Sequence, residues 1–199
     1  INMVAEGMKY DKRIGKHFLD AGIGYGGSCF PKDVSAFIWI AEKFGYDFKL
    51  LKTIEEINEN QWQHFYKKVE DALWVLKDKT IGILGLSFKT NTDDLRNAPA
   101  IKIIEKLKKE GVTIKAYDPV SMDKAKEIIK DIEYVDTIEK AAVNANAILL
   151  ITEWDEFIEL DWKDIYHNML KPAFLFGGRR LLEPTTKKEI GFEFYAIGN

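Results

Sequence analysis

The sequence holds one cysteine in 199 residues, so it cannot form an internal disulfide. No apolar run is long enough to span a membrane, and the first residues do not resemble a signal peptide. The formal net charge is only −3 and comes from interspersed acidic and basic residues. This pattern gives no electrostatic footprint for nucleic acid or an anionic membrane. A reducing cytoplasm fits these absences best.

An initiator methionine is also absent, because the chain begins with Ile1 in the middle of a pattern. The sequence therefore suggests a piece of a longer protein. Its apolar content of 46% is ample for packed cores, and its length allows one large domain or two small ones.

A glycine-rich segment at residues 22–33, GIGYGGSCFPKD, is the most informative stretch. Its four glycines let the backbone approach a ligand closely, and they lead directly into Cys29. Pro31 suits the first turn of a helix, so Cys29 should stand at the positive end of a helix and near the Lys32 ammonium. Both favour a thiolate, as a nucleophile requires. The alternative is a buried structural cysteine, the commoner fate of a lone one.

The same segment satisfies G-x-G-x-x-G through Gly22, Gly24 and Gly27. A dinucleotide-binding turn needs a hydrophobic strand before this motif and a helix that opens at its third glycine. Residues 16–20 are not a convincing strand, so we reject that interpretation.

The remaining elements predict an α/β fold. Residues 31–44 and about 50–76 show helical periodicity, and the length of the second suggests a spine helix. Strands and helices then alternate, which predicts a Rossmann-like, doubly wound parallel sheet. The predicted strands are 80–86, 112–117, 147–151, 173–176 and 192–196, and the predicted helices between them are 99–109, 122–130, 138–144 and 162–169.

Ligands of such a sheet bind outside the carboxyl ends of its strands. Three loops there carry residues suited to chemistry: 87–89, 152–154 and 177–179. Lys89 is a point charge and Arg179 a bidentate fork, a combination that suits a diphosphate.

Four stretches in this order resemble the UDP-glucose dehydrogenase family, the nucleotide-sugar 6-dehydrogenases. They are the DKRIG of residues 11–15 with the glycine–cysteine segment, GLSFK through DLR at 85–96, TEWDEF at 152–157 and FGGRR at 176–180. The resemblance covers essentially the whole chain. It implies a central, helical dimerisation and active-site domain at 1–77 with a long connecting helix, and a UDP-sugar-binding domain at 78–199. The N-terminal NAD-binding domain of the family is absent from these residues.

The resemblance also implies roles for single residues. Cys29 matches the catalytic nucleophile, and Asp33 matches the carboxylate that supports its reaction and the later hydrolysis. NAD-binding positions match Lys32 and Arg96. Positions that meet the nucleotide sugar match Arg13, Phe18, Gly24, Tyr25, Gly26, Gly27, Phe88, Lys89 and Arg179. In some members the arginine that matches Arg13 acts across a subunit boundary.

The implied reaction oxidises UDP-glucose to UDP-glucuronate with NAD, in two hydride transfers through a covalent adduct on Cys29. Two departures stand out: Gly177 replaces an aspartate that is usual before the Gly-Arg pair, and a catalytic lysine and asparagine of the family lie outside this sequence. Loss of that aspartate would loosen the orientation of Arg179. We expect no turnover by these residues alone, and a homodimer or higher homo-oligomer through the central helix.

Other readings stay open. Within the class, the substrate could be GDP-mannose or UDP-N-acetylmannosamine, although the SCFPKD segment favours UDP-glucose. From another class, the chain could be a non-catalytic UDP-sugar-binding and dimerisation module. A cysteine hydrolase is a poor fit, because His17, His64 and His167 have no evident orienting carboxylate.

Overall fold

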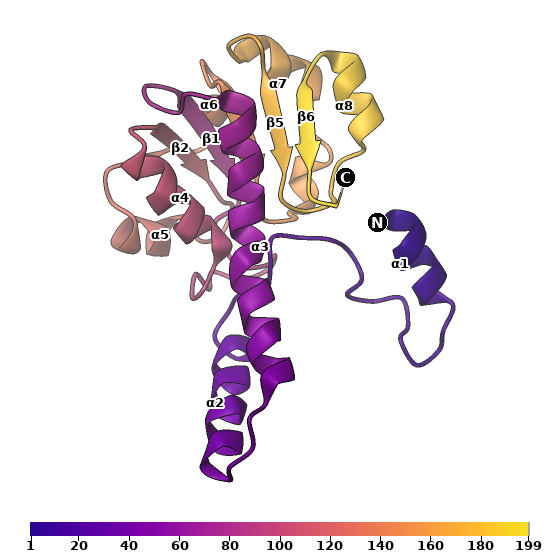
Figure 1. Cartoon of the computed structure of the whole chain (residues 1–199). Helices are drawn as coiled ribbons and strands as arrows, with labels where there is room; N and C mark the ends of the chain where they lie inside the picture. The colour runs from indigo at the N-terminus through magenta and orange to yellow at the C-terminus, as the bar shows by residue number, and fades with distance from the viewer. Residues whose placement is uncertain (199) are drawn as a thin grey trace.

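The computed structural model describes residues 1–198, and it places a parallel sheet at one end of a long helix (Figure 1). The helices, in chain order, are α1 (Asn2–Lys9), α2 (Phe30–Lys43), α3 (Lys49–Leu73), α4 (Pro99–Lys109), α5 (Met122–Ile128), α6 (Ile138–Ala142), α7 (Trp162–Asn168) and α8 (Pro184–Ile190). The strands are β1 (Thr80–Leu84), β2 (Thr113–Tyr117), β3 (Glu133–Tyr134), β4 (Ala147–Leu150), β5 (Phe174–Gly177) and β6 (Glu193–Ala196), with a 3-10 turn at Asp155–Phe157. The two ends of the chain meet, since Ile1 lies against Gly198.

Helix α3 is the spine of the molecule. One half carries the buried residues Phe65, Val69 and Leu73 beside the sheet, and the other half extends away and packs against α2 (Figure 1). The predicted end near residue 76 is wrong by three residues. The helix ends at Leu73 because Trp74 adopts a left-handed φ of 59°, and Leu76 still reaches the core from the turn that follows.

The sheet has the strand order β3-β2-β1-β4-β5-β6, and every pair is parallel. Strand β4 shows how the two faces are covered. Ala147 and Leu149 point into one core with α3 and α4, whereas Ile148 and Leu150 point into a second core with α6 and α7. Because both faces are buried, the strand is a continuous apolar run without polar alternation. The predicted doubly wound α/β fold is confirmed.

Strand β3 and helix α8 were not predicted. Strand β3 has two residues and pairs only with β2, so it carries too little sequence to show a pattern. Helix α8 begins at Pro184, and the Glu183 side chain caps it by accepting a hydrogen bond from the Thr185 N–H. Helices α5 and α6 each end two residues earlier than expected, at Ile128 and Ala142.

The chain reverses its direction of travel across the sheet between β1 and β4, which are neighbours but not consecutive strands. Loops that follow these strands diverge there, and the gap between them is where open α/β sheets bind ligands. The division of the chain near residue 77 stays a prediction.

Candidate functional site

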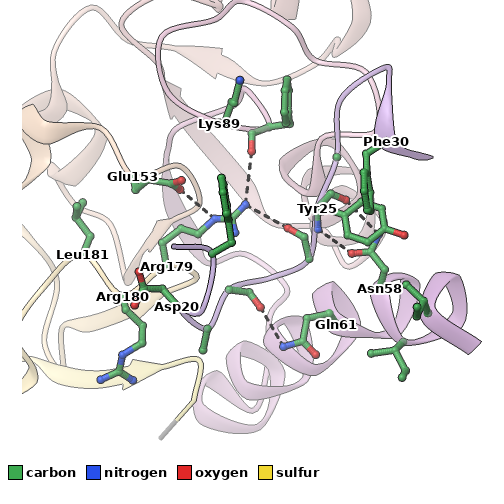
Figure 2. Close-up of a pocket in the computed structure, with 18 residues that line it drawn as sticks. Asp20, Tyr25, Phe30, Asn58, Gln61, Lys89, Glu153, Arg179, Arg180 and Leu181 are labelled. Atoms are coloured by element: carbon green, nitrogen blue, oxygen red, sulfur yellow. Dashed lines mark hydrogen bonds and ion pairs between the residues drawn. The ribbon is translucent and has the colours of Figure 1, made fainter. Parts of the chain in front are cut away.

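A cavity of about 840 Å³ lies at the carboxyl ends of β1, β4 and β5, between the loops that follow these strands, the glycine-rich segment and α3 (Figure 2). Its lining residues are Phe18, Asp20, Ala21, Gly22, Gly24, Tyr25, Gly26, Phe30, Ile54, Ile57, Asn58, Gln61, Phe88, Lys89, Glu153, Arg179, Arg180 and Leu181. Segments separated by more than a hundred residues in sequence thus line the same cavity. The loops after β1, β4 and β5, which we expected to act together, all contribute lining residues.

Arg179 is at the centre of this cavity. Its Nη2 donates to the Gly24 carbonyl at 3.2 Å and to the Phe88 carbonyl at 3.5 Å. Its Nε lies 3.1 Å from Glu153 Oε2 in an ion pair. A side chain at Gly22 would collide with this arrangement, because a Cβ there would lie 2.3 Å from Arg179 Nη1. The glycine therefore makes room for the guanidinium.

Phe88 and Lys89 enter from the loop after β1. The Lys89 ammonium lies 5.5 Å from the centre of the Phe88 ring. That ring also covers Gly27, where a Cβ would lie 2.8 Å from Phe88 Cζ. Gly27 has a φ of 86°, so this position needs glycine for both its backbone conformation and its space.

Tyr25 contributes a buried hydroxyl that has no hydrogen-bond partner among the described residues. The ring packs edge-on against Phe30 at 4.7 Å between centroids. Burial, and to a lesser degree Glu55, raises the pKa of Tyr25 above its ordinary value. The phenol therefore stays protonated at neutral pH.

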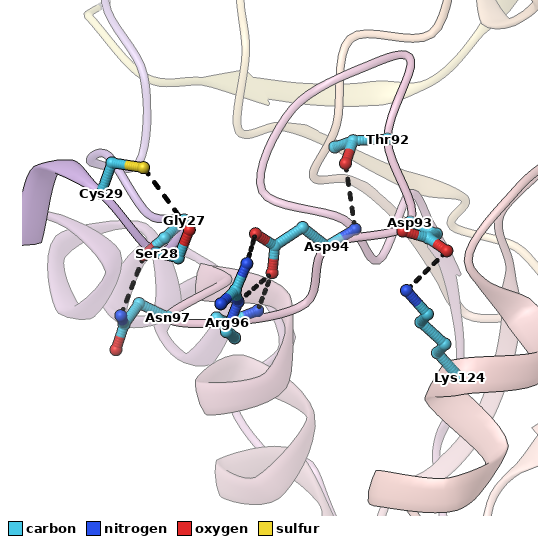
Figure 3. Close-up of polar contacts among 9 residues, drawn as sticks. All are labelled: Gly27, Ser28, Cys29, Thr92, Asp93, Asp94, Arg96, Asn97 and Lys124. Carbon is cyan, nitrogen blue, oxygen red and sulfur yellow. Dashed lines mark hydrogen bonds and ion pairs between the residues drawn. The ribbon is translucent and has the colours of Figure 1, made fainter.

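Cys29 is the N-cap residue of α2, which begins at Phe30. The cysteine is exposed, and its Sγ lies 3.7 Å from Ser28 Oγ (Figure 3). Asp33 is in the first turn of the helix, where its N–H donates to the Cys29 carbonyl at 2.8 Å. The Lys32 ammonium, which we expected to favour the thiolate, pairs with the Asp33 carboxylate at 3.1 Å.

Arg96 lies beside the same segment (Figure 3). Its guanidinium donates to both carboxylate oxygens of Asp94 at 2.9 Å, and its backbone carbonyl accepts from the Gly27 N–H at 2.8 Å. The pKa of Arg96 is raised, mainly by the Asp94 carboxylate, with a smaller contribution from Cys29. A cation paired with Asp94 therefore lies beside the segment that leads into the predicted nucleophile.

The predicted residues thus divide into two groups. Seven of them line the cavity: Phe18, Gly24, Tyr25, Gly26, Phe88, Lys89 and Arg179. Outside its lining are Gly27, which underlies Phe88, and the cluster of Cys29, Lys32, Asp33 and Arg96. Arg13 is also outside it, since its side chain is 90% exposed and pairs with Asp11 at 2.7 Å.

Sequence reasoning missed several polar residues that shape the site. Asn58 and Gln61 project from α3, where Gln61 Nε2 donates to the Gly22 carbonyl at 3.0 Å. Glu153 lies in a stretch that was recognised, but its pairing with Arg179 was not foreseen. Asp118, which follows β2, accepts from the Leu86 N–H at 2.7 Å and so holds the start of the loop after β1. The i, i+3 spacing of the two amides is a signal for a shared helix face, although not for what they bind.

The G-x-G-x-x-G string does not form a dinucleotide-binding turn in this structure. Gly22 lies in an isolated antiparallel bridge with Arg179, no strand immediately precedes it, and the next helix begins at Phe30 rather than at Gly27. Among residues 1–198, no group of three His, Cys, Asp or Glu side chains is placed to hold a metal ion. No helix in that range is both long and apolar enough to cross a membrane.

Two family models match this chain. The UDP-binding domain of the UDP-glucose/GDP-mannose dehydrogenase family matches residues 82–184, and the central domain of the same family matches residues 1–60. The chain is 41% identical over its whole length to UDP-glucose 6-dehydrogenase YwqF of Bacillus subtilis and covers 45% of that protein. It is 36% identical to UDP-glucose 6-dehydrogenase of Drosophila melanogaster, again covering 45%.

Solved structures agree. A UDP-glucose dehydrogenase from the hyperthermophilic archaeon Pyrobaculum islandicum superposes with a TM-score of 0.85 at 30% identity, over 98% of this chain and 42% of that one. A UDP-D-ManNAc dehydrogenase from Pyrococcus horikoshii superposes with a TM-score of 0.76 at 27% identity, over 99% and 44%. The chain spans less than half the length of these relatives. From its fold and from the family models that match residues 1–60 and 82–184, we conclude that the chain belongs to the UDP-glucose/GDP-mannose dehydrogenase family.

Proposed function

We propose that this chain is the substrate-binding and nucleophile-bearing part of an NAD-dependent UDP-glucose 6-dehydrogenase that converts UDP-glucose to UDP-glucuronate. The observation that carries this proposal is the convergence of Lys89, Arg179 and the glycine-rich segment on one cavity. Two cations beside closely approaching backbone suit the diphosphate of a nucleotide sugar. Family membership and the relatives named above support the same assignment.

The Tyr25 hydroxyl and the Phe88 ring support binding of the rest of the ligand. Tyr25 keeps its proton and has no partner among the described residues, so it can donate to a substrate oxygen. Phe18 is fully exposed at the cavity edge, where a sugar or uracil would cover it. We assign Gly24 and Gly26 to close backbone contact with the sugar.

The proposed chemistry oxidises C6 twice. The C6 alcohol loses a hydride and a proton to give an aldehyde, and the Cys29 sulfur adds to the carbonyl carbon while its oxygen takes a proton. Loss of a second hydride together with the hydroxyl proton converts this thiohemiacetal to a thioester. Water then cleaves the C–S bond, giving the carboxylate, the free thiol and a proton. An oxidised nicotinamide dinucleotide would accept the hydride, one molecule in each of the two oxidation steps. Asp33 is in the same helical turn as Cys29 and is our candidate to assist the hydrolysis.

These residues fit only one edge of a dinucleotide site. Arg96 offers an exposed guanidinium beside Cys29, and we assign it, with Lys32, to the cofactor side of the reaction. The described residues contain no dinucleotide fingerprint at the glycine motif. We therefore expect no NADH formation by this chain alone.

We further propose a homodimer through α2 and the outer half of α3. This region exposes several large apolar side chains, namely Phe37, Trp39, Phe44, Tyr46, Leu50 and Ile57. Exposed apolar side chains gathered on neighbouring elements mark an interaction surface, and a second copy of the chain would bury them. Sedimentation of this chain as a monomer would argue against it. With its lone thiol, the protein is expected to act in the cytoplasm.

The decisive experiment counts NADH per sugar. This chain is fused behind the first half of the Bacillus subtilis relative, and NADH is measured with UDP-glucose, GDP-mannose and UDP-N-acetylmannosamine. We expect two NADH per UDP-glucose, and a Cys29→Ala variant that stalls after the first oxidation. If only GDP-mannose or UDP-N-acetylmannosamine were oxidised, that nucleotide sugar would replace UDP-glucose as the proposed substrate. Binding of UDP with no turnover of any sugar would leave a binding module.

A further inference from the structure

Two asparagines from different elements hydrogen-bond the backbone of the glycine-rich segment, and neither has a role in the function proposed above. Each one bonds a peptide group shortly before Cys29: Asn58 at Tyr25 and Asn97 at Gly27. The bonds join positions 33 and 70 residues apart, so they are tertiary contacts rather than local turn bonds.

Asn58 is half-buried on α3 and makes a reciprocal pair with Tyr25. The Tyr25 N–H donates to Asn58 Oδ1 at 2.7 Å, and Asn58 Nδ2 donates back to the Tyr25 carbonyl at 3.1 Å (Figure 2). Gly24 makes this approach possible, because a Cβ there would lie 2.7 Å from Asn58 Oδ1. A single carboxamide thus satisfies both polar groups of one residue, much as a neighbouring strand would.

Asn97 lies in the loop between β1 and α4. Its Nδ2 donates to the Gly27 carbonyl at 3.0 Å, while the Gly27 N–H donates to the Arg96 carbonyl at 2.8 Å (Figure 3). Asn97 has a left-handed φ of 53°, a conformation that asparagine tolerates better than most residues. Gly26 must lack a side chain here, since a Cβ would lie 2.4 Å from the Asn97 carbonyl oxygen.

We propose that Asn58 and Asn97 are positioning residues that together fix Cys29 relative to the cavity. Tyr25 and Gly27 lie four and two residues before Cys29. We call the hydrogen bonds of Asn58 to Tyr25 and of Asn97 to Gly27 the two clasps. Because the backbone is fixed at these two residues, only a short segment remains between the clasps and the cysteine. Both carboxamides are uncharged and non-titrating, so they hold the segment without adding charge beside the nucleophile. The catalytic consequence rests on the function proposed above, whereas the positioning itself does not.

The first test needs no enzymatic activity. Cys29 is the only cysteine, so a nitroxide label on this chain reports on that site alone. The variants are Asn58→Ala, which keeps a strong helix former on α3, and Asn97→Gly, which keeps the left-handed backbone. Their matched controls are Asn60→Ala, an exposed position on the same helix, and Asn144→Gly, an exposed asparagine with a φ of 57°.

Loss of one neutral hydrogen bond shifts a local equilibrium by about fivefold. We therefore expect the ratio of mobile to immobile label in the electron paramagnetic resonance spectrum to rise about fivefold in Asn97→Gly and at least as much in Asn58→Ala. Both controls should leave the spectrum unchanged. Equal mobility in a clasp variant and its control, with both proteins folded, would overturn the proposal.

The second test uses the fusion enzyme and asks where the aldehyde goes. A displaced Cys29 captures the aldehyde more slowly, so a hydrazine trap should collect aldehyde from Asn97→Gly and the NADH yield should fall from two toward one per sugar. A merely destabilised enzyme would lose rate but keep the yield of two. If the label were more mobile in Asn97→Gly but the variant still formed two NADH per sugar, the proposed effect of the asparagines on aldehyde capture would be overturned. Failure of the wild-type fusion to oxidise any sugar would overturn the proposed function, and the label spectra would still decide the positioning.

Discussion

Glu153 Oε2 lies 3.1 Å from Arg179 Nε, and the two residues follow the neighbouring strands β4 and β5. The family resemblance led us to expect a loosely oriented Arg179, because Gly177 replaces the usual aspartate two residues before it. In the structure a carboxylate reaches the guanidinium from the adjacent loop. Two backbone carbonyls, of Gly24 and Phe88, complete its surroundings. Two hydrogen bonds and one ion pair therefore hold Arg179 without Asp at position 177.

This relationship predicts the effect of Glu153→Gln on UDP binding. The Glu153 side chain is 41% exposed, so the ion pair contributes no more than about 1 kcal/mol. We expect UDP affinity to fall about fivefold, because the guanidinium loses its carboxylate partner. Isothermal titration calorimetry of this chain with UDP measures the change, and the exposed Glu159→Gln is the matched control. Tighter UDP binding by Glu153→Gln would instead show that the carboxylate only repels the ligand.

A second prediction concerns the shape of the cation. Arg179→Lys keeps the charge but cannot reach Glu153, Gly24 and Phe88 at once, because an ammonium is a single point rather than a fork. We expect the dissociation constant for UDP to rise at least tenfold, or about 1.4 kcal/mol. Titration at low and high salt separates the effect of the positive charge, which salt screens, from the effect of the hydrogen-bond geometry. If the lysine variant bound UDP as the arginine does, charge alone would explain the site.

The third prediction tests why Gly27 must be glycine. Gly27 and Gly45 both have left-handed φ values, of 86° and 75°, but only Gly27 lies against another side chain, the Phe88 ring. Gly45→Ala should therefore cost only the backbone strain, about 1–2 kcal/mol. Gly27→Ala adds a steric clash, and we expect it to lower the free energy of unfolding by about 1–3 kcal/mol more. Urea denaturation compares the two; equal losses would mean that the ring moves aside freely.

The elements that the sequence predicted are those with strong local patterns. Strands β1 and β4 are unbroken apolar runs, and α4 is bounded by Pro99 and Gly111, so periodicity and turn residues are enough to find them. The alternation of strands and helices then predicts a parallel, doubly wound sheet, although it does not fix the strand order β3-β2-β1-β4-β5-β6. The early end of α3 was not predictable in this way, because neither glycine nor proline marks Trp74, where the helix ends.

The site was predictable only in part. The loops at the strand ends were recognised because parallel strands bring their carboxyl ends together. Asn58, Asn97 and Glu153 were not, because each acts through a contact at least 26 residues away along the chain. In sequence, polar residues such as these look like ordinary solvated positions. Asp118 was missed for the same reason, although it is 99% buried.

Asp118 provides the last prediction, which depends on pH. Its Oδ2 accepts from the N–H groups of Leu86 and Ser87 and from Trp154 Nε1, and its Oδ1 accepts from the Ser121 N–H at 2.8 Å. Burial disfavours the charged carboxylate, but the hydrogen bonds outweigh it, so the pKa of Asp118 lies below its ordinary value. A carboxyl group with a lowered folded-state pKa stabilises the fold above its unfolded pKa, and this contribution disappears as the pH falls through the folded value.

Asp118→Asn removes the charge and gives an amide that cannot accept all of these bonds. We expect the free energy of unfolding at pH 7 to fall by about 3 kcal/mol, and UDP binding to weaken because the loop that carries Phe88 and Lys89 is released. As the pH falls below about 4, protonation of the wild-type carboxyl should bring the two proteins closer together. Urea denaturation from pH 7 to pH 3 tests this, with the exposed Asp123→Asn as control. A difference that stayed constant down to pH 3 would mean that the side-chain contacts, rather than the charge, give Asp118 its effect.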